Sequence, residues 1–512
     1  MSCRKLDAYI KITPVLCAAC GAALAYYCLF PLYRSGFMSI NALLVSAFVP
    51  AAALCFFWVL VSLPVFISIE PRAERLLRLA PLRIMAFAAG LALGIGAGTM
   101  AVQKVVFGIP QDTVRGISGV LLDDPRIISG GRAMTTISLR MVMGSGGVRA
   151  TAHGEITVFF PEENAARLKE FGRGTEVFAD GYLRSNTGNF GSAYTFSAEN
   201  LHITKTAPPF ERFRTNLRLG LVQRFANGKT DGWGGLAIAL LVGIRDNLDT
   251  ELVSLYRDAG CSYILALSGM HLAVLIGLIS FLLKKPLGLR PAAITGALII
   301  IAYCFIVGPL PSLIRSALMY ILGVLAVLGM LKRDALALLC MAFLIQLLAT
   351  PQAGLSLSFI LSYTALLGIL IIGVVLNELL KGFVPPFLLQ SLNISLGAFI
   401  ATAAITTWFF GVLRPVGIVA GLIIAPLTTV FMIGSMAWLA LDSMLPVLSP
   451  VLGKPLSLLY WLMEKTAQLA AYIPGIKANP MLIVSLSLLL VVLILWLDYR
   501  RRLVNNRLEP FA

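Results

Sequence analysis

The sequence predicts a polytopic α-helical membrane protein that carries one sizeable β domain outside the membrane. Only 13% of its 512 residues are charged and 58% are hydrophobic, whereas a soluble protein usually has about 25% charged residues. Many windows contain the ~20 apolar residues that an α-helix needs to cross a bilayer. Residues 104–206 are the exception, because charges return there and short alternating segments replace the long apolar blocks.

Residues 1–103 are predicted to form an N-terminal membrane segment with three spans, at 12–31, 39–69 and 84–103. The first span follows Arg4, Lys5 and Lys11 and is expected to act as a start-transfer anchor that stays in the protein. A basic loop at 70–83 separates the other two spans. Since cytoplasmic loops collect Lys and Arg, the N-terminus and this loop are expected inside the cell, and residue 104 outside.

Residues 104–206 are predicted to form an extracytoplasmic OB-like β-barrel. Alternating apolar residues indicate five strands, at 114–122, 133–143, 146–160, 175–184 and 193–204. A short helix is expected at 161–174, between the third and fourth strands, and this order is typical of an OB-fold. Another small β-barrel or a sandwich is the alternative. No cysteine lies between 104 and 232, which excludes an internal disulfide in this domain.

Residues 207–261 are predicted to hold basic amphipathic and interfacial helices. Apolar residues in 207–232 are mixed with Arg212, Arg214, Arg218 and Arg224. Such a stretch is typical of a helix on the membrane surface, and contact with nucleic acid is the alternative. The segment 233–261 is too short and polar for an ordinary hairpin of spans, so a re-entrant or interfacial helix fits it better.

Residues 262–498 are predicted to form a membrane domain of nine spans, which brings the total to about 12. These spans are expected at 262–283, 291–308, 310–331, 335–350, 353–377, 386–412, 415–441, 455–473 and 479–497. Basic residues fall at every second loop and in the tail 499–512, which places both termini in the cytoplasm. Such loops explain the net charge of +16, although a polyanionic partner such as nucleic acid would also fit it.

Two ionisable side chains inside apolar segments are candidates for function, because a charge within a membrane is costly. Arg315 lies in PLPSLIRSALMY, and His271 lies in the middle of SYILALSGMHLAVLIGL. Ser268 would share a helix face with His271, and Gly269 would allow a close backbone approach or a break in the helix. A buried histidine satisfied by a hydroxyl is the structural alternative. A Ser–His nucleophile is disfavoured, since the span holds no carboxylate to orient the histidine.

Hydroxyl side chains recur in SLSFILSYTALLGI, at Ser356, Ser358, Ser362 and Thr364. Spacings of about four residues predict one polar helix face, which would form a hydrophilic pore wall. Helix–helix hydrogen bonding, common in membrane bundles, is the alternative.

Motifs for several other functions are missing. The sequence has no GxxxxGK[ST] phosphate-binding loop, so the chain is not expected to drive transport with ATP by itself. It has three histidines and no cluster suited to a two-metal hydrolase. We therefore expect no enzymatic activity, no catalytic residue, no metal and no cofactor.

The segment LVGIRDNLDTELVSLYRDAGCSYILALSGMHLAVL, residues 241–275, resembles the signature of the ComEC competence family. The matching positions are Gly243, Arg245, Arg257, Ala259, Gly260, Ala266, Ser268, Gly269 and His271. Supporting elements resemble the family at Arg315, Pro351, Phe359, Leu361, Ser362 and Pro426. The sequence departs from the family pattern at Tyr263, Ile360 and Gly421, where the family has His, Gln and Asn.

The resemblance implies a channel in the cytoplasmic membrane that passes single-stranded DNA into the cell during natural transformation. A polyanion needs a hydrated path with positive potential. The residues expected to line it are Arg245, Arg257, Ser268, Gly269, His271, Arg315, Ser358 and Ser362. The OB-like domain would hold the strand by aromatic stacking. Phe190, Tyr194 and Phe196 are the candidates, of which at least one is expected in the core instead.

The expected partners are single-stranded DNA and the lipid bilayer, with a separate nuclease, a DNA receptor and an ATP-driven motor as open candidates. Larger family members carry a terminal metallo-β-lactamase-like domain that this sequence does not contain, so a nuclease role is not expected of it. Two other functions are alternatives: transport of a small solute or lipid intermediate, and a membrane scaffold whose soluble domain binds a partner.

Overall fold

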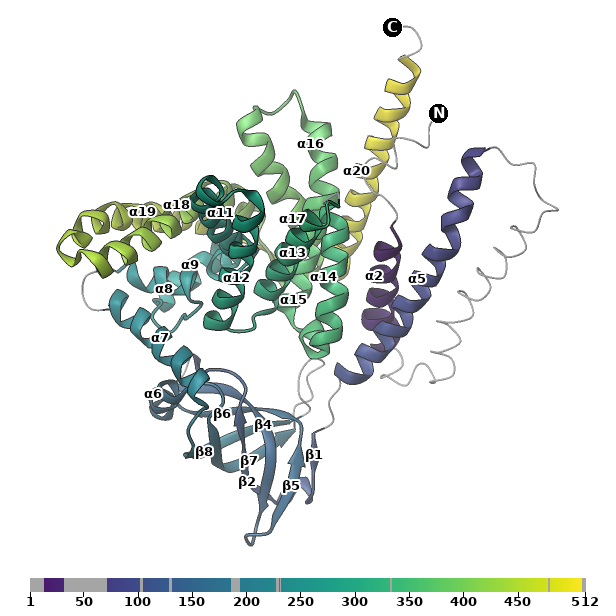
Figure 1. Ribbon diagram of the computed structural model, residues 1–512. Coiled ribbons are helices and arrows are strands. Elements are labelled where there is room, and N and C mark those ends of the chain that lie inside the picture. Colours follow the sequence, from purple (N-terminus) through teal and green to yellow (C-terminus); the bar gives the residue numbers. More distant parts are fainter. Residues whose placement is uncertain are drawn as a thin grey trace.

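The structure is a computed structural model that describes residues 13–31, 71–101, 105–128, 131–185, 194–226, 230, 232–331, 334–477 and 479–508. Helices make up most of it, and one eight-stranded sheet lies at an end of the helical part (Figure 1). A mostly helical protein with one β domain is the predicted fold class. The predicted total of about 12 spans and the OB-like barrel are not confirmed.

The N-terminal helices form a tightly packed pair. Helix α2 (Pro14–Leu24) continues into the π-helical turn η1 (Ala25–Leu29) and packs along α5 (Pro71–Ala101). A Cβ on Gly90 would lie 2.0 Å from the Ala18 carbonyl oxygen. The helices thus approach through glycine, as small-residue interfaces in membranes do.

The predicted basic loop at 70–83 is wrong from Pro71 onward, since that segment is the start of α5. Its Glu, Arg, Leu and Ala residues all favour helix, which accounts for the difference. The predicted span 39–69 lies outside the described residues.

The helical part after the sheet contains short and long helices. The short ones are α8 (Gly234–Leu241), α9 (Thr250–Asp258), α10 (Ser262–Leu265), η4 (Pro351–Leu355), η5 (Ile369–Gly373), α16 (Val374–Leu380) and η6 (Pro446–Leu448). The longer ones are α11 (Gly269–Leu287), α12 (Leu289–Val307), α13 (Pro311–Leu328), α14 (Ala335–Ala349), α15 (Leu357–Gly368), α17 (Pro386–Phe410), α18 (Val416–Met444), α19 (Ser449–Ala471) and α20 (Pro480–Leu508). A two-stranded ribbon, β9 (Val412–Leu413) with β10 (Ile476–Lys477), joins the ends of α17 and α19.

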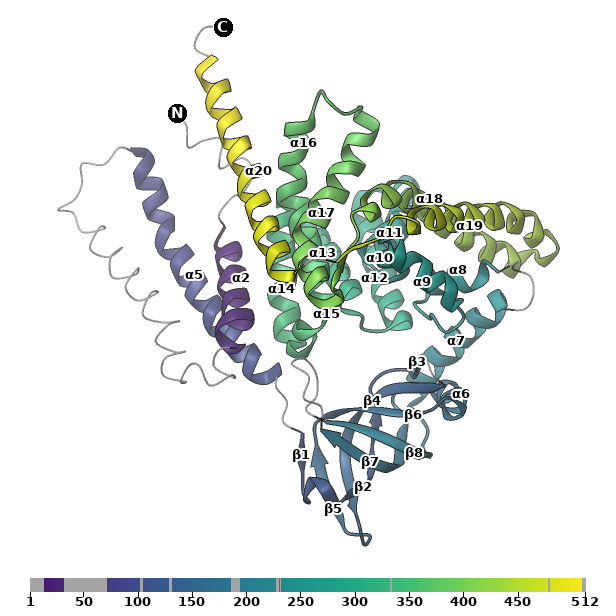
Figure 2. The same cartoon turned by 180° about the vertical axis from the view of Figure 1, so that it is seen from behind.

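Seven helical stretches among the described residues are long and apolar enough to cross a membrane. They are Leu82–Ala101, Gly269–Leu287, Leu289–Val307, Pro311–Leu328, Leu357–Leu380, Pro386–Phe410 and Val416–Met444. Three shorter apolar helices are Pro14–Leu29, Ala335–Ala349 and Pro480–Ile494. The predicted span 455–473 lies in α19, which carries Lys454, Glu464 and Lys465 and is not among the seven. In both views α18 and α19 run across the direction of α13, α17 and α20 (Figure 1, Figure 2).

The predicted span 262–283 is interrupted. Helix α10 ends at Leu265, Ala266 and Ser268 are extended, and α11 begins at Gly269. Ser268 precedes the helix as its N-cap, and His271 lies in the first turn. The prediction that these two residues share a helix face in mid-span is therefore wrong. A serine followed by a glycine favours a helix start over a helix interior, because serine caps the free N–H groups.

The segment 233–261 folds inward. In α8 every residue from Leu236 to Leu241 is buried. Next to it, the rings of Phe225, Trp233, Phe431 and Trp438 form a buried aromatic cluster. Non-spanning helices at membrane depth are tolerated when protein surrounds them. Helix α8 is accordingly a core element and not an interfacial one.

The sheet begins after α5. Its strands are β1 (Val106–Phe107), β2 (Val114–Leu121), β3 (Arg126–Ile128), β4 (Arg132–Gly144), β5 (Arg149–His153), β6 (Glu155–Pro161), β7 (Glu176–Ser185) and β8 (Tyr194–Lys205). The predicted third strand, 146–160, is split into β5 and β6 by Gly154, whose φ of +119° a side chain would disfavour. The predicted helix is α6 (Glu162–Phe171), between β6 and β7.

Five of these strands are paired in a closed circuit. Strand β2 pairs with β4, β4 with β6, β6 with β8, β8 with β7, and β7 again with β2. The β6–β8 pair is parallel and the other four are antiparallel. The enclosed core consists of apolar side chains such as Ile117, Ile137 and Phe160. Helix α7 (Pro209–Ala226) then leads from the sheet to the helical part (Figure 2).

Candidate functional site

Polar side chains gather where the start of α11 meets the start of α13. His271 is 1% exposed and Arg315 is 7% exposed. Both helices begin here because their first residues favour it: Ser268 precedes α11, and Pro311 occupies the first position of α13. We call His271, Arg315 and the residues that contact them the polar crossing.

Ser268 fixes the orientation of the His271 ring. The backbone N–H of Ser268 donates to Nδ1 of His271 at 3.1 Å, and the Ser268 hydroxyl lies 3.0 Å from the same nitrogen. Since Nδ1 accepts a hydrogen bond, the neutral ring is assigned the tautomer with its proton on Nε2. Nε2 is buried and makes no hydrogen bond to any described residue. It is therefore a donor without a hydrogen-bond acceptor of normal geometry among the described residues.

Arg315 is a buried cation held by neutral groups. Its guanidinium donates to the carbonyl oxygen of Ser362 and, at 3.3 Å, to the hydroxyl of Ser316. Its Cζ atom lies 5.9 Å from the centre of the Tyr363 ring. Among the described residues, no ion pair includes Arg315, and its Nε atom has no hydrogen-bond partner. The polar crossing thus offers N–H donors and a positive charge, the groups that bind an anion.

Gly269 permits the close approach that the sequence predicted. A Cβ at this position would lie 2.6 Å from the Ser316 hydroxyl oxygen and 2.8 Å from Nη2 of Arg315. Any side chain would therefore displace the guanidinium.

Replacing Gly269 by alanine is expected to destabilise the protein by about 1 kcal/mol, the lower end for an overpacked site. The matched control is Gly277→Ala in the same helix, where an added Cβ meets nothing within 4 Å. That change should stabilise the protein by up to about 1 kcal/mol through helix propensity. Thermal unfolding in detergent would measure both. Equal effects of the two substitutions would contradict the close approach.

A second layer of hydrogen bonds holds the helices around the polar crossing. The Ser312 hydroxyl donates to the Leu267 carbonyl at 2.6 Å. The Gln346 side chain, 1% exposed, donates to the Pro311 carbonyl at 3.0 Å and accepts from the Tyr363 hydroxyl at 2.9 Å. Sequence reasoning missed Ser312, Gln346 and Tyr363. A single amide in the otherwise apolar helix α14 was the signal that could have identified Gln346.

The other residues predicted for the path lie on different elements, and one of them, Ser362, belongs to the polar crossing. Arg257 is exposed on α9, and its side chain is 70% accessible. Ser358 is exposed on α15, whereas Ser362 contacts Arg315 through its backbone carbonyl. Ser356 is the N-cap of α15, where its hydroxyl accepts from the Phe359 N–H at 3.2 Å. Arg245 is exposed in the loop after α8.

The three aromatic residues predicted for DNA stacking have different environments. Phe196 is fully buried in the core of the sheet, so it cannot stack on a ligand. Tyr194 is half-buried: its hydroxyl bonds Gln111 at 2.8 Å, and its ring packs edge-on against Phe107. Phe190 lies outside the described residues.

Helix α7 joins the sheet to the helical part through buried arginines. Arg214 is 3% exposed. Its guanidinium donates to the Asp124 carboxylate at 2.8 Å and to the Phe305 carbonyl at 2.9 Å. Arg218 donates to the Ile306 carbonyl at 3.0 Å and to the Val307 carbonyl. These carbonyls end α12, where the helix dipole favours a cation. The two arginines therefore stabilise this junction. The amphipathic pattern had instead predicted that they would face the membrane surface.

Asp124 is the acidic centre of this junction. Burial alone would raise the pKa of its carboxyl, but Arg218, Arg214 and the Arg173 N–H together hold that pKa below its ordinary value. Asp124 therefore stays ionised at neutral pH and binds α7 to the loop between β2 and β3.

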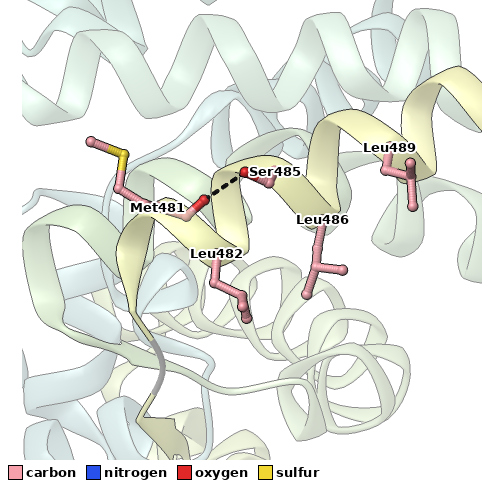
Figure 3. A pocket seen from close by; sticks show the side chains of 5 residues that line it. All are labelled: Met481, Leu482, Ser485, Leu486 and Leu489. Atoms are coloured by element: carbon pink, nitrogen blue, oxygen red, sulfur yellow. Dashed lines mark hydrogen bonds between the residues drawn. The ribbon is translucent and has the colours of Figure 1, made fainter.

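Two other features carry no site. A hollow of about 430 Å³ runs along α20 and is lined by Met481, Leu482, Ser485, Leu486 and Leu489. The Ser485 hydroxyl donates to the Met481 carbonyl of the same helix at 3.0 Å (Figure 3). The rest of the lining is apolar and suited to lipid. Within the part of the chain that the structure describes, no group of three or more His, Cys, Asp or Glu residues is placed to hold a metal ion.

Comparison with known proteins gives one family and two relatives. Residues 240–501 match the profile of a family described as "Competence protein". "ComE operon protein 3" of Bacillus subtilis (strain 168) is 32% identical over 141 residues, which cover 26% of this chain and 18% of that protein.

An "Uncharacterized protein" of Aquifex aeolicus (strain VF5) is 28% identical over 287 residues, which cover 55% of this chain and 64% of that protein. The matches thus span less than two thirds of either relative. No solved structure matches the chain.

Proposed function

Because the chain belongs to the competence protein family, we propose that it is a channel that passes single-stranded DNA across the cytoplasmic membrane during natural transformation. The observation that carries this proposal is Arg315, a buried guanidinium without a carboxylate partner among the described residues. The name of the Bacillus subtilis relative, which places it in a ComE operon, agrees with a role in competence.

An unpaired arginine at this depth is unfavourable unless something compensates it. Insertion scales give a cost of about 2.5–3.5 kcal/mol for an arginine at the centre of a membrane helix, which is an upper bound for Arg315 in the second turn of α13. Two neutral oxygens and one aromatic ring compensate Arg315 only in part. A phosphodiester passing the polar crossing would supply the missing negative charge, and the His271 Nε2–H would supply a further donor to it.

The sheet is proposed as the part that receives the strand outside the membrane. Five strands paired in a closed circuit, with a helix between the third and fourth, support an OB-like barrel. Such domains hold single strands by a basic groove with aromatic faces. Tyr194 is the candidate for such a face among the described residues, whereas Phe196 is buried in the core of the sheet.

The topology follows from the same proposal. Both termini lie in the cytoplasm and the sheet lies outside, in a multi-pass protein of the cytoplasmic membrane. The chain contributes passage and no chemistry of its own. A separate nuclease would degrade the other strand, and a DNA receptor and an ATP-driven motor would deliver and pull the transported one.

Transformation frequency, with and without the gene, tests the proposal. Deletion is expected to abolish transformation and the uptake of labelled DNA, and the full chain supplied in trans should restore both. Normal DNA uptake in the deletion strain would overturn the proposal. A substrate-dependent flux of a small solute through liposomes without DNA would favour a solute transporter instead.

A further inference from the structure

Two phenylalanine rings stack where the start of α7 meets the end of α12. Phe210 is the second residue of α7, and Phe305 lies in the last turn of α12. Their ring centroids are 4.1 Å apart and their planes differ by 28°. Phe305 is half-buried, whereas Phe210 is 64% exposed. Phe305 therefore covers one face of the Phe210 ring, and the other face is open.

A small pocket lies beside this stacked pair, at the junction where α7 connects the sheet to the helical part (Figure 1). Its volume is about 250 Å³, below the ~300–1,000 Å³ of sites for drug-sized ligands. The occupant is thus limited to a group of one or two rings. The apolar lining includes Phe305, Pro309 and Ile314, and the charged lining is Arg173, Glu211 and Arg214.

The backbone that carries Phe305 is fixed before any ligand binds. Arg214 donates to the Phe305 carbonyl at 2.9 Å, and Arg218 donates to the Ile306 carbonyl at 3.0 Å. Gly308, which follows the helix, has a φ of +107°, and a Cβ there would lie 3.2 Å from Nη2 of Arg214. Binding to a surface held in this way costs little ordering of the protein.

The charged groups at the pocket are paired with one another. Glu211 contacts Arg173 at 3.4 Å and Arg214 at 3.5 Å, and Asp124 contacts Arg214 at 2.8 Å. Two guanidiniums thus meet two carboxylates, so the pocket has no excess charge that would attract an anion. The same charged groups make it unsuited to a hydrocarbon chain. Its distinguishing feature is the aromatic surface of the stacked pair.

We propose that Phe210, Phe305 and the pocket beside them form a stacking site for one base of the single-stranded DNA. The inference rests on the proposed function and adds a binding subsite between the sheet and the polar crossing. A neutral aromatic site fits a base better than a phosphate, because every base has a π-face. For the same reason the site should tolerate any sequence.

The position of the site fits this role. Ile314, which lines the pocket, immediately precedes Arg315 of the polar crossing on α13. A base held on Phe210 and a phosphate held at Arg315 would thus belong to neighbouring parts of one strand. Stacking at the junction would orient the strand before it enters the helical part.

Binding of two fluorescent oligonucleotides of equal length to the full chain in zwitterionic nanodiscs tests the site. One is oligothymidylate, and the other is an abasic strand that keeps the phosphates and sugars but has no bases. Phe210→Ala should weaken binding of oligothymidylate by about 5- to 150-fold, the loss for one stacked base. Binding of the abasic strand should stay unchanged. Phe210→Tyr keeps an aromatic ring and should bind both strands like the wild type.

Phe213→Ala is the matched control. Phe213 is 62% exposed on the same helix, three residues after Phe210, and is not part of the pocket lining. Its replacement should change neither affinity. Since both rings are exposed, the thermal midpoints of the two alanine variants should stay close to that of the wild type.

The possible failures are distinguishable. Unchanged oligothymidylate binding by Phe210→Ala, an equal loss for the abasic strand, or an equal loss in Phe213→Ala would overturn this site while wild-type binding still supports the channel. No binding of either strand by the wild-type chain would count against the proposed function itself. Phe210→Trp tests for lipid: if brominated phospholipids quench its added fluorescence and oligothymidylate does not, the ring faces lipid and the DNA assignment is wrong.

Discussion

Replacing Arg315 by methionine is expected to lower DNA uptake by about 10- to 150-fold while thermal stability stays unchanged or rises. The loss corresponds to one hydrogen bond to a charged group, worth about 1.5–3 kcal/mol. Stability should not fall, because a buried charge replaced by an apolar side chain of similar volume is often neutral or stabilising. A residue kept for structure would show the opposite combination.

Two further variants sharpen this test. Arg315→Lys keeps the charge but loses the planar fork, so DNA uptake should lie between the wild type and Arg315→Met. Arg290→Ala removes an exposed arginine from the start of α12 and should leave uptake near the wild-type level. Uptake of labelled DNA and unfolding in detergent are the two measurements. Lower stability together with normal uptake in Arg315→Met would contradict the assigned role.

Replacing Asp124 by asparagine is expected to destabilise the junction of the sheet and α7 by about 3 kcal/mol. The change leaves Arg214, which is 3% exposed, with only the Glu211 carboxylate at 3.5 Å as an ionised partner, and a buried charge whose main ion pair is broken is strongly destabilising. Hydrogen exchange of α7 and of the loop between β2 and β3 should speed up, and the thermal midpoint should fall. The double variant Asp124→Asn with Arg214→Met should recover part of the loss, since Arg218 is then the remaining cation that has lost its carboxylate.

The neighbouring residue supplies a matched control. Asp123→Asn removes the same charge one position earlier. Burial is the main cause that raises the pKa of Glu155, and repulsion from the Asp123 carboxylate raises it further. Relief of this repulsion should leave stability unchanged or slightly higher. An equal loss in both variants would mean that charge alone, and not the contact with Arg214, matters.

The Asp124 contact also predicts how stability depends on pH. The pKa of this carboxyl is lower in the folded state than its ordinary value of 3.8. The contribution of the ion pair is therefore complete above that ordinary value and is lost as the pH falls through the lower folded value. Below about pH 4 the difference in thermal midpoint between the wild type and Asp124→Asn should narrow.

Sequence patterns identified the kind of each element better than its interruptions. Apolar length places α12, α13 and α17 within a few residues of their predicted bounds. The same criterion predicts one continuous span across Ala266 and Ser268, because neither a charge nor a proline marks the break there. What ends α10 is the extended backbone before Gly269, whose missing Cβ admits Arg315 of another helix. A contact between segments distant in the chain leaves no periodic trace in either one.

The candidate site was predictable in part, because a polar residue or a glycine is conspicuous within an apolar segment. Arg315, His271 and Gly269 stand out within apolar segments, and the structure brings them together with Ser268 and Ser362.

The arginines of α7 also matter for the order in which the chain is made. Arg214 precedes the Phe305 carbonyl by 91 residues, and Arg218 precedes the Ile306 carbonyl by 88. The donors that satisfy the end of α12 therefore leave the ribosome well before the acceptors do. Because N-terminal domains generally fold first during synthesis, we expect the last turn of α12 to meet partners that the folded sheet already holds. A circular permutation that moved α7 behind α12 would keep every contact of the final fold and lose this advantage during insertion.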